Sequence, residues 1–300
     1  MSLVVSEVTK RFRDVTAVND LSFTVQTGSL FGFLGPNGAG KTTTMRVVLD
    51  IIKPDKGRVT WKGQPFHHWG RGFFGYLPEE RGLYPKMRLG EHLEFLGRIH
   101  GLDGRKAQTE TERWIERFDL GDLRHKRIEE LSKGNQQKVQ TIGTMLHDPE
   151  LLILDEPFSG LDPVNTALLK EVLLEANKKG RTIIFSSHRM DQVEEICEDI
   201  VLINKGRLLL HGNLKEIKKS MGRRILRLAL EGRTDFWQGL SGLELLTSRP
   251  DYQEFRLGEG VDPNEILAAA LEAGQVIRFE LVEPSLDQIF VEKVGAKTWA

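Results

Sequence analysis

The chain has a single cysteine among its 300 residues and no long apolar run. Cys197 has no second cysteine to pair with, so an intramolecular disulfide is excluded and a reducing compartment is expected. Apolar stretches such as Leu151–Leu154 fall far short of the roughly 18 to 20 residues that a membrane-spanning helix needs. No signal peptide is predicted, because the first residues lack a basic stretch followed by an apolar core. Any role at a membrane is therefore expected to come through a partner.

An excess of charge of one sign is also missing. The 42 basic and 43 acidic residues leave a net charge of −1, which provides no overall field for nucleic acid. We therefore expect no nucleic-acid partner. Hydrophobic residues make up 39% of the chain and charged residues 28%, which is typical of a globular protein with one large or two smaller domains.

A glycine-rich loop with a Lys-Thr pair stands between an apolar run and a helical pattern. The loop comprises Gly35, Pro36, Asn37, Gly38, Ala39, Gly40, Lys41, Thr42 and Thr43. Loops of this kind bind phosphate through backbone N–H groups at a helix N-terminus, and their glycines permit positive φ angles. The motif predicts that Lys41 reaches the β- and γ-phosphates and that Thr42 binds Mg²⁺. Apolar residues recur at helical spacing from Met45 to Ile52, which predicts a helix ending just before Lys53.

Acidic residues and a histidine follow three other apolar strands. Glu79 follows one strand, Asp155 and Glu156 the next, and His188 the third. Ligands of α/β sheets bind at the carboxyl ends of strands, so these side chains are candidate site residues. An Asp in this position holds Mg²⁺ in phosphate-loop proteins, and the following Glu can accept a proton from water. A buried acid pair without a cation would be costly.

One helix start and one aromatic residue each leave two interpretations open. Ser132 and Gly134 open a helix that runs to about Leu146, where they form either a second anion site or a simple N-cap. Asp162 caps a further helix. Phe12 lies among cations and either stacks on a base or packs against an edge strand.

A change of pattern marks a second domain after about residue 222. Apolar residues alternate from Leu226 to Leu230 and from Ile277 to Leu281, and Pro263–Ala273 reads as a helix between them. We interpret residues 222–300 as an accessory α+β domain, since they carry no catalytic constellation. The preceding residues, 1–218, contain all the motifs. Residues 106–118 read as a helix, and aromatic residues there, such as Trp114, are expected to pack in the protein core.

The ordered set of motifs resembles the ATP-binding subunit of ABC transporters over roughly Leu3–Leu214. The motifs are the phosphate loop, Tyr76–Glu79, Leu131–Lys138, Ile153–Pro157, Ser159–Asp162 and His188. The resemblance implies a P-loop cassette of the α/β class with a RecA-like core, an antiparallel β subdomain and a helical subdomain at about residues 80–146. The tail, ending in Glu283–Phe290, resembles a bacterial exporter branch for sodium, drug or antibiotic efflux.

The resemblance also implies roles, carried over by motif. Phe12 stacks on adenine, and Mg²⁺ is held by Thr42, Glu79 and Asp155. Glu156 is the general base, and His188 contacts the γ-phosphate. ATP bound to the opposite subunit is contacted by Ser132, Gly134 and Asn135, and Asp162 links the two sites. Each ATP then lies between two copies, so a homodimer is expected. Two departures stand out: Glu79 replaces the usual Gln, and Lys133 and Asn135 replace Gly and Gln.

The expected function is ATP hydrolysis that drives a separate transmembrane subunit at the cytoplasmic face of the membrane, with export as the expected direction. One alternative is a soluble ABC-type ATPase that acts on ribosomes or nucleic acid. Two features weigh against this alternative. The chain has a single cassette, and only about ninety residues without sustained heptads separate the phosphate loop from the Leu131–Lys138 motif. A non-catalytic nucleotide-binding regulator is disfavoured by the intact Lys41, Asp155, Glu156 and His188.

Overall fold

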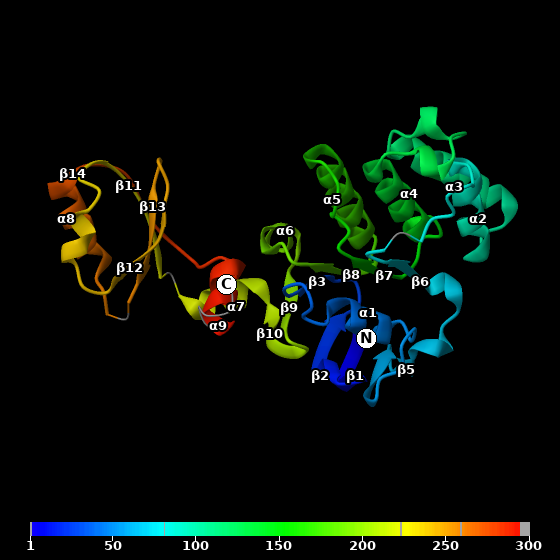
Figure 1. The fold of residues 1–300 in the computed structure, drawn as a ribbon, viewed down its shortest axis with the longest axis horizontal. Coiled ribbons are helices and arrows are strands. Elements are labelled where there is room, and N and C mark those ends of the chain that lie inside the picture. The colour runs from blue at the N-terminus through cyan, green and yellow to red at the C-terminus, as the bar shows by residue number, and fades with distance from the viewer. Residues whose placement is uncertain (1, 81, 223, 259, 295–300) are drawn as a thin grey trace. The chain divides into compact units, whose positions relative to one another are not determined.

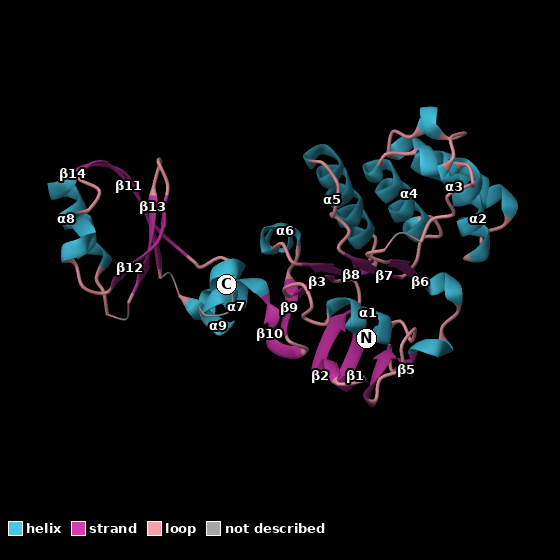
Figure 2. Ribbon diagram, in the orientation of Figure 1, coloured by secondary structure: helices cyan, strands magenta, loops and turns pink. Residues whose placement is uncertain are grey.

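The computed structural model describes residues 2–80, 82–222, 224–258 and 260–294. The chain divides into two compact units, Met1–Asn213 and Leu214–Ala300. The helix α7, Leu214–Met221, belongs to the second unit, although the sequence pattern had assigned its first residues to the cassette. Figure 1 follows the chain through both units, and Figure 2 shows their helices and strands.

Two sheets form the framework of the first unit. The four-stranded antiparallel sheet has the order β2 (Val15–Gln26), β1 (Ser2–Phe12), β4 (Lys56–Trp61) and β5 (Gln64–Pro65). The six-stranded sheet has the order β10 (Arg207–Asn213), β9 (Asp199–Asn204), β3 (Leu30–Leu34), β8 (Thr182–Ser187), β7 (Leu151–Asp155) and β6 (Phe74–Leu77). Its strands are parallel except for β10. The predicted α/β class is therefore confirmed.

Helices cover the six-stranded sheet on both faces. The helices of the first unit are α1 (Lys41–Val48), α2 (Leu89–Ile99), α3 (Gly104–Arg117), α4 (Lys133–Met145), α5 (Pro163–Lys178) and α6 (Met190–Ile196), with short 3-10 turns at Phe66–His68, Arg71–Phe73, Gly121–Leu123 and Ile128–Glu130. Of these, α2 and α3 pack against each other, and α2 packs against α4. Figure 1 shows α1 between the two sheets and α4 and α5 on the opposite face of the larger one. Met45 and Val48 of α1 share a buried core with Phe23, Phe31 and Ile153 from both sheets. The strands β3, β7 and β8 are buried along their whole length, as parallel strands between helices require.

The first helix ends earlier than the periodicity predicted. The sequence pattern indicated a helix continuing through Ile52, but α1 ends at Val48. Asp50 has a φ of 60°, a left-handed conformation that a helix cannot include. Ile52 nevertheless packs against the core, so its periodic spacing reflects burial rather than helical structure.

The second unit is a sheet covered by a helix. Its strand order is β12 (Leu243–Ser248), β13 (Gln253–Leu257), β11 (Ile225–Gly232) and β14 (Gly274–Val282), with helices α8 (Pro263–Ala273) and α9 (Leu286–Val294) and a 3-10 turn at Phe236–Gly239. Leu226, Leu228, Phe255 and Ile266 form its core.

One predicted inward residue of this unit faces out. Ile277 is 56% exposed, although the alternation from Ile277 to Leu281 placed it on the same face as Phe279. The register between β11 and β14 shifts here, because Ala229 pairs with Arg278 while Leu230 pairs with Val276. Ile277 is therefore the extra residue of a bulge, and Val276 packs against the core in its place.

Candidate functional site

The glycine-rich loop connects β3 directly to α1, as predicted. Gly40 is the N-cap residue of α1 with a φ of 101°, and a Cβ there would come within 2.3 Å of the Ala17 carbonyl oxygen. The Gly206 N–H donates to the Ala39 carbonyl at 2.9 Å, which ties the loop to the β9–β10 turn. The loop thus presents its backbone N–H groups at a helix N-terminus, the geometry that binds phosphate.

A cavity of about 450 Å³ lies against this loop. Its lining comprises residues 36–43 of the loop, Glu79, Asp155 and Glu156 at the ends of β6 and β7, and Val15, Thr16 and Ala17 of β2. The volume is within the range of about 300–1,000 Å³ typical of small-molecule sites. The structure therefore brings the loop and the three predicted carboxylates to one place. Gly35 contacts the site indirectly, since its carbonyl accepts a hydrogen bond from Lys41 Nζ at 2.8 Å.

Asp155 presents a carboxylate oxygen without a protein partner to this cavity. The side chain is 1% exposed, and its Oδ1 accepts a hydrogen bond from the Ser186 hydroxyl. Its Oδ2 is buried and has no hydrogen-bond partner among the described residues. A buried carboxylate oxygen is costly unless a cation or donor balances it. This orphaned atom, beside the Thr42 hydroxyl and the Glu79 carboxylate of the lining, suits a hard divalent cation.

These side chains do not complete a metal site by themselves. Within the described ranges, no three His, Cys, Asp or Glu side chains gather closely enough to hold a metal. Mg²⁺ in nucleotide sites is typically bound by one or two carboxylates together with phosphate oxygens. The donor set here fits that pattern.

Glu156 lies between a lysine and a histidine. Its Oε1 is 3.4 Å from Lys41 Nζ and 3.0 Å from His188 Nδ1. The Glu156 side chain is 10% exposed, whereas that of His188 is 48% exposed. The carboxylate is therefore shielded on the side of Lys41 and reaches solvent through His188, an arrangement suited to accepting a proton from a water in the cavity.

The backbone at Glu156 is held in an uncommon conformation. Its φ is 50°, in the left-handed region that non-glycine residues rarely adopt. Ser186 Oγ accepts from the Glu156 N–H at 2.9 Å, and the Glu156 carbonyl accepts from the Ser159 N–H at 3.1 Å. Ser186 thus orients both acids, because its hydroxyl also donates to Asp155.

Four of the predicted site residues lie outside this cavity, at two helix starts. Ser132 caps α4 by accepting from the Asn135 N–H at 3.3 Å, and Asp162 caps α5 by accepting from the Asn165 N–H at 2.9 Å. The latter bond is the main cause of a lowered pKa of Asp162. Gly134 lies beside Gly160, whose carbonyl oxygen would be 3.9 Å from a Cβ at position 134.

Phe12 also lies outside the cavity lining, but its neighbour does not. The ring is 46% exposed at the end of β1, and Lys10 Nζ lies 5.5 Å from its centroid. Phe12 pairs across the β1–β2 hairpin with Val15, which lines the cavity. The ring is therefore an exposed face at the cavity entrance.

Sequence reasoning missed several residues of this site. Val15, Thr16 and Ala17 carry no motif, and their only signal was their position just after Phe12. The orienting role of Ser186 was also missed, although its place at the end of a buried strand could have suggested it.

None of the helices in the described part of the chain is long and apolar enough to cross a bilayer.

Comparison with known proteins gives a consistent result along the whole chain. The family model described as "ABC transporter" matches residues 18–159, and the one described as "ATP-binding protein DrrA1-3-like, C-terminal domain" matches residues 212–294. The uncharacterized ABC transporter ATP-binding protein YhaQ of Bacillus subtilis is 46% identical over 294 residues, which cover 98% of this chain and 99% of that protein.

Solved structures agree with the sequence relatives. An ATP-binding subunit of an ABC transporter is 30% identical, with a TM-score of 0.69 over 74% of this chain and 94% of that chain. A dimeric post-hydrolysis state of the ATP-binding cassette MJ0796 bound to ADP and Pi is 19% identical, with a TM-score of 0.65 over 71% and 98%. At that identity the likeness shows the fold alone. The predicted cassette fold is confirmed.

Proposed function

The chain belongs to the ATP-binding subunits of ABC transporters and is an ATPase, and from this premise we propose that it drives an exporter whose membrane-spanning part is a separate chain. One observation carries the proposal: the cavity at the phosphate loop gathers Lys41, Glu79, Asp155 and Glu156. Binding, charge neutralisation and proton acceptance are the functions that phosphoryl transfer to water requires.

In the proposed mechanism, the loop N–H groups and Lys41 bind the phosphates of ATP. Asp155 Oδ2, the Thr42 hydroxyl and Glu79 would hold Mg²⁺, which neutralises charge on the phosphates when bound. Lys41 Nζ already lies beside Glu156, so a phosphate at the loop would sit close to the carboxylate that accepts the proton of the attacking water. His188 then hydrogen-bonds Glu156 from the solvent side and is placed to contact the terminal phosphate.

A second copy of the chain is part of the proposal. Ser132, Gly134, Asn135 and Asp162 lie outside the cavity of their own chain, at the N-termini of α4 and α5. Helix N-termini attract anions, so this surface suits the phosphates of an ATP held by another copy. A homodimer with two shared sites follows.

An exposed apolar patch supports a membrane partner. Tyr84 is 52% exposed, Phe95 38% and Ile99 49%, and the rings of Tyr84 and Phe95 lie 5.6 Å apart. The patch follows Glu79 closely in the chain, and Gln140 of α4 holds the connecting segment through the Pro78 carbonyl. A movement of Glu79 toward bound nucleotide can therefore reach the patch.

Export is supported by the C-terminal match, which covers residues 212–294 and agrees with the exporter-type tail of the sequence. The alternative of an ATPase acting on ribosomes or nucleic acid is not favoured, since the relatives are named as transporter subunits.

The contact with a membrane partner is tested by introducing a charged residue into the apolar patch. The membrane subunit is identified by co-purification from detergent-solubilised membranes and reconstituted with Tyr84→Glu. We expect basal ATPase to stay near wild type and transport to be lost, because a carboxylate is costly to bury in an apolar interface. The control Leu271→Glu places the same charge on another exposed apolar residue, in α8. Unimpaired transport, or equal loss of basal ATPase, would count against this contact.

A further inference from the structure

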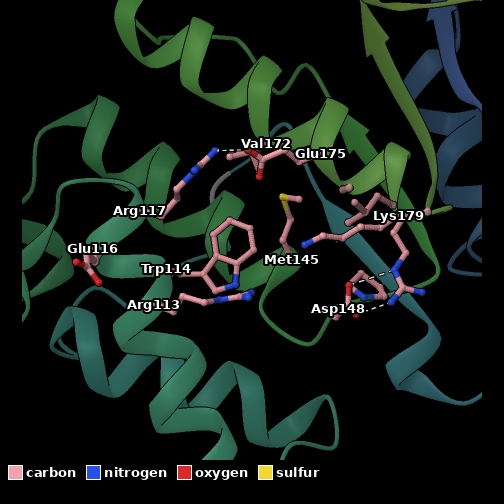
Figure 3. A pocket seen from close by; sticks show the side chains of 13 residues that line it. Arg113, Trp114, Glu116, Arg117, Met145, Asp148, Val172, Glu175 and Lys179 are labelled. Atoms are coloured by element: carbon pink, nitrogen blue, oxygen red, sulfur yellow. Dashed lines mark hydrogen bonds and ion pairs between the residues drawn. The ribbon is translucent and has the colours of Figure 1, made fainter.

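A second cavity, of about 380 Å³, lies in the first unit away from the phosphate loop (Figure 3). It is bounded by α3, the connection from α4 to β7 and the C-terminal part of α5, and none of its described lining residues belongs to the first cavity. Leu152 and Arg181 place it at the amino ends of β7 and β8. The catalytic acids lie at the carboxyl end of β7, so the two cavities occupy opposite edges of the sheet.

The inner wall of this cavity is apolar. Met145, Leu152 and Val172 are each at most 5% exposed, and Trp114 of α3 adds a flat aromatic face. Figure 3 shows the indole of Trp114 and the side chain of Met145 facing the same space between the helices. Such a wall suits a flat apolar molecule.

Most charges at the rim neutralise one another. Arg117 Nη2 lies 2.7 Å from Glu175 Oε1, and Arg181 forms an ion pair with Asp148. Arg113 forms an ion pair with Glu110, with Nη2 2.7 Å from Oε2, and its guanidinium carbon lies 5.5 Å from the centroid of the Trp114 ring.

Lys179 is different from the other cations of the rim. Its ammonium forms neither an ion pair nor a hydrogen bond with any residue that the structure describes, and Figure 3 shows it reaching toward Met145. Glu116 is the remaining acid of the lining, but Figure 3 shows it on the outer side of α3, away from Met145 and Lys179. Among the described lining residues, Lys179 is therefore the one cation without an ion-pair partner, and it lies beside an apolar wall.

A second donor is also left without an acceptor. Trp114 Nε1 is shielded from solvent and has no hydrogen-bond partner within the described part of the chain. Buried donors without partners cost free energy, which an acceptor on a bound molecule would recover. Both available polar groups, the indole N–H and the ammonium, thus require an acceptor, and the ammonium favours an anion.

From these observations we propose that this cavity is a binding site for a small amphipathic carboxylate, with a flat apolar body against Trp114 and its carboxylate at Lys179. The occupant contacts α3 on one side and α5 on the other, and so connects these two helices. Binding does not depend on ATP hydrolysis and can be measured without it.

The test uses isothermal titration calorimetry of the full chain with 2-naphthoate and its neutral counterpart 2-naphthamide. We expect one saturable site per chain for the acid and about five- to tenfold weaker binding of the amide, because the amide cannot form a charge-assisted bond. Lys179→Met should weaken naphthoate by about the same factor and leave naphthamide unchanged.

Two further variants separate this site from general association. Lys178→Met removes the neighbouring lysine, which does not line the cavity, and should leave the affinity for naphthoate within about twofold of wild type. Trp114→Leu removes the aromatic face and should weaken both ligands. The proposal is overturned by equal affinity for acid and amide, by equal effects of Lys178→Met and Lys179→Met, or by no saturable binding up to millimolar ligand.

Discussion

At the residue scale, neighbouring residues hold both the side chain and the backbone of Glu156. Lys41 and His188 contact its carboxylate, and Ser186 Oγ accepts a hydrogen bond from its backbone N–H, where the φ is left-handed. A residue held in this way is preorganised, because its carboxylate needs little rearrangement when a water is presented to it.

Replacing this carboxylate tests its role as the base. Glu156→Gln should lower kcat by about 10²- to 10⁴-fold, since an amide cannot accept a proton. ATP binding should persist, because the loop and Lys41 are unchanged. Single-turnover hydrolysis and equilibrium nucleotide binding measure the two effects separately. Glu80→Gln is the matched control, as this acid follows Glu79 in the chain and does not line the cavity. Turnover near wild type in Glu156→Gln would remove the residue from this role.

Two buried histidines make the stability of the chain depend on pH. Burial lowers the pKa of His92 and of His147 to about 4, and a nearby His100 adds to the effect at His147. Between pH 6.5 and 4 the unfolded chain binds more protons than the folded one. The stability contributed by neutral histidines is therefore fully present above pH 6.5 and is lost as pH falls toward 4.

The free energy of unfolding should decrease by about 2 kcal/mol per buried histidine between pH 7 and pH 5. Urea denaturation at the two pH values measures this change. His92→Leu should remove about half of this change, because it removes one of the two buried histidines. The substitution breaks no hydrogen bond, since both ring nitrogens of His92 lack partners within the described residues. His125→Leu replaces an exposed histidine and should behave as wild type. An unchanged pH dependence in His92→Leu would refute this assignment.

At the element scale, the strands and helices with strong local signals were predictable. The buried runs became β3, β7 and β8, and helix α8 has the predicted bounds Pro263–Ala273. The errors came where pairing or a single φ decided the outcome. The bulge at Ile277 depends on the partner strand β11, and the end of α1 depends on the left-handed Asp50. Neither is visible in a periodic pattern.

The same distinction applies to the site. The loop and the acids were recognisable by residue type and spacing, because phosphate chemistry restricts which residues occur there. Val15 to Ala17 and Ser186 were not, since they reach the site through the β1–β2 hairpin and through the register that pairs Asp155 with Ser186. Trp114 has the spacing of a core residue, but its ring is only partly buried and forms the wall of the second cavity.

At the scale of the whole molecule, the proposed dimer accounts for the way the predicted site residues are divided between two surfaces of one chain. The phosphate loop and the acids line one surface, while Ser132 and Asp162 cap helices that start elsewhere on the same unit. A shared site explains why the two sets are present but not adjacent, because each would be completed by the other set on a second copy.

ATP should therefore cause two copies of the chain to dimerise when hydrolysis is blocked. The variant Glu156→Gln is expected to sediment as a monomer without nucleotide and as a dimer with MgATP, measured by analytical ultracentrifugation. Adding Ser132→Arg should abolish the ATP-dependent dimer, since a long cation would occupy the place of the γ-phosphate and remove the cap. Ser132 is exposed, so losing its cap costs only about 0.5–2 kcal/mol and leaves the chain folded. Ser248→Arg, an exposed serine of β12, should leave the dimer intact. A dimer that survives Ser132→Arg would place the second half of the site elsewhere.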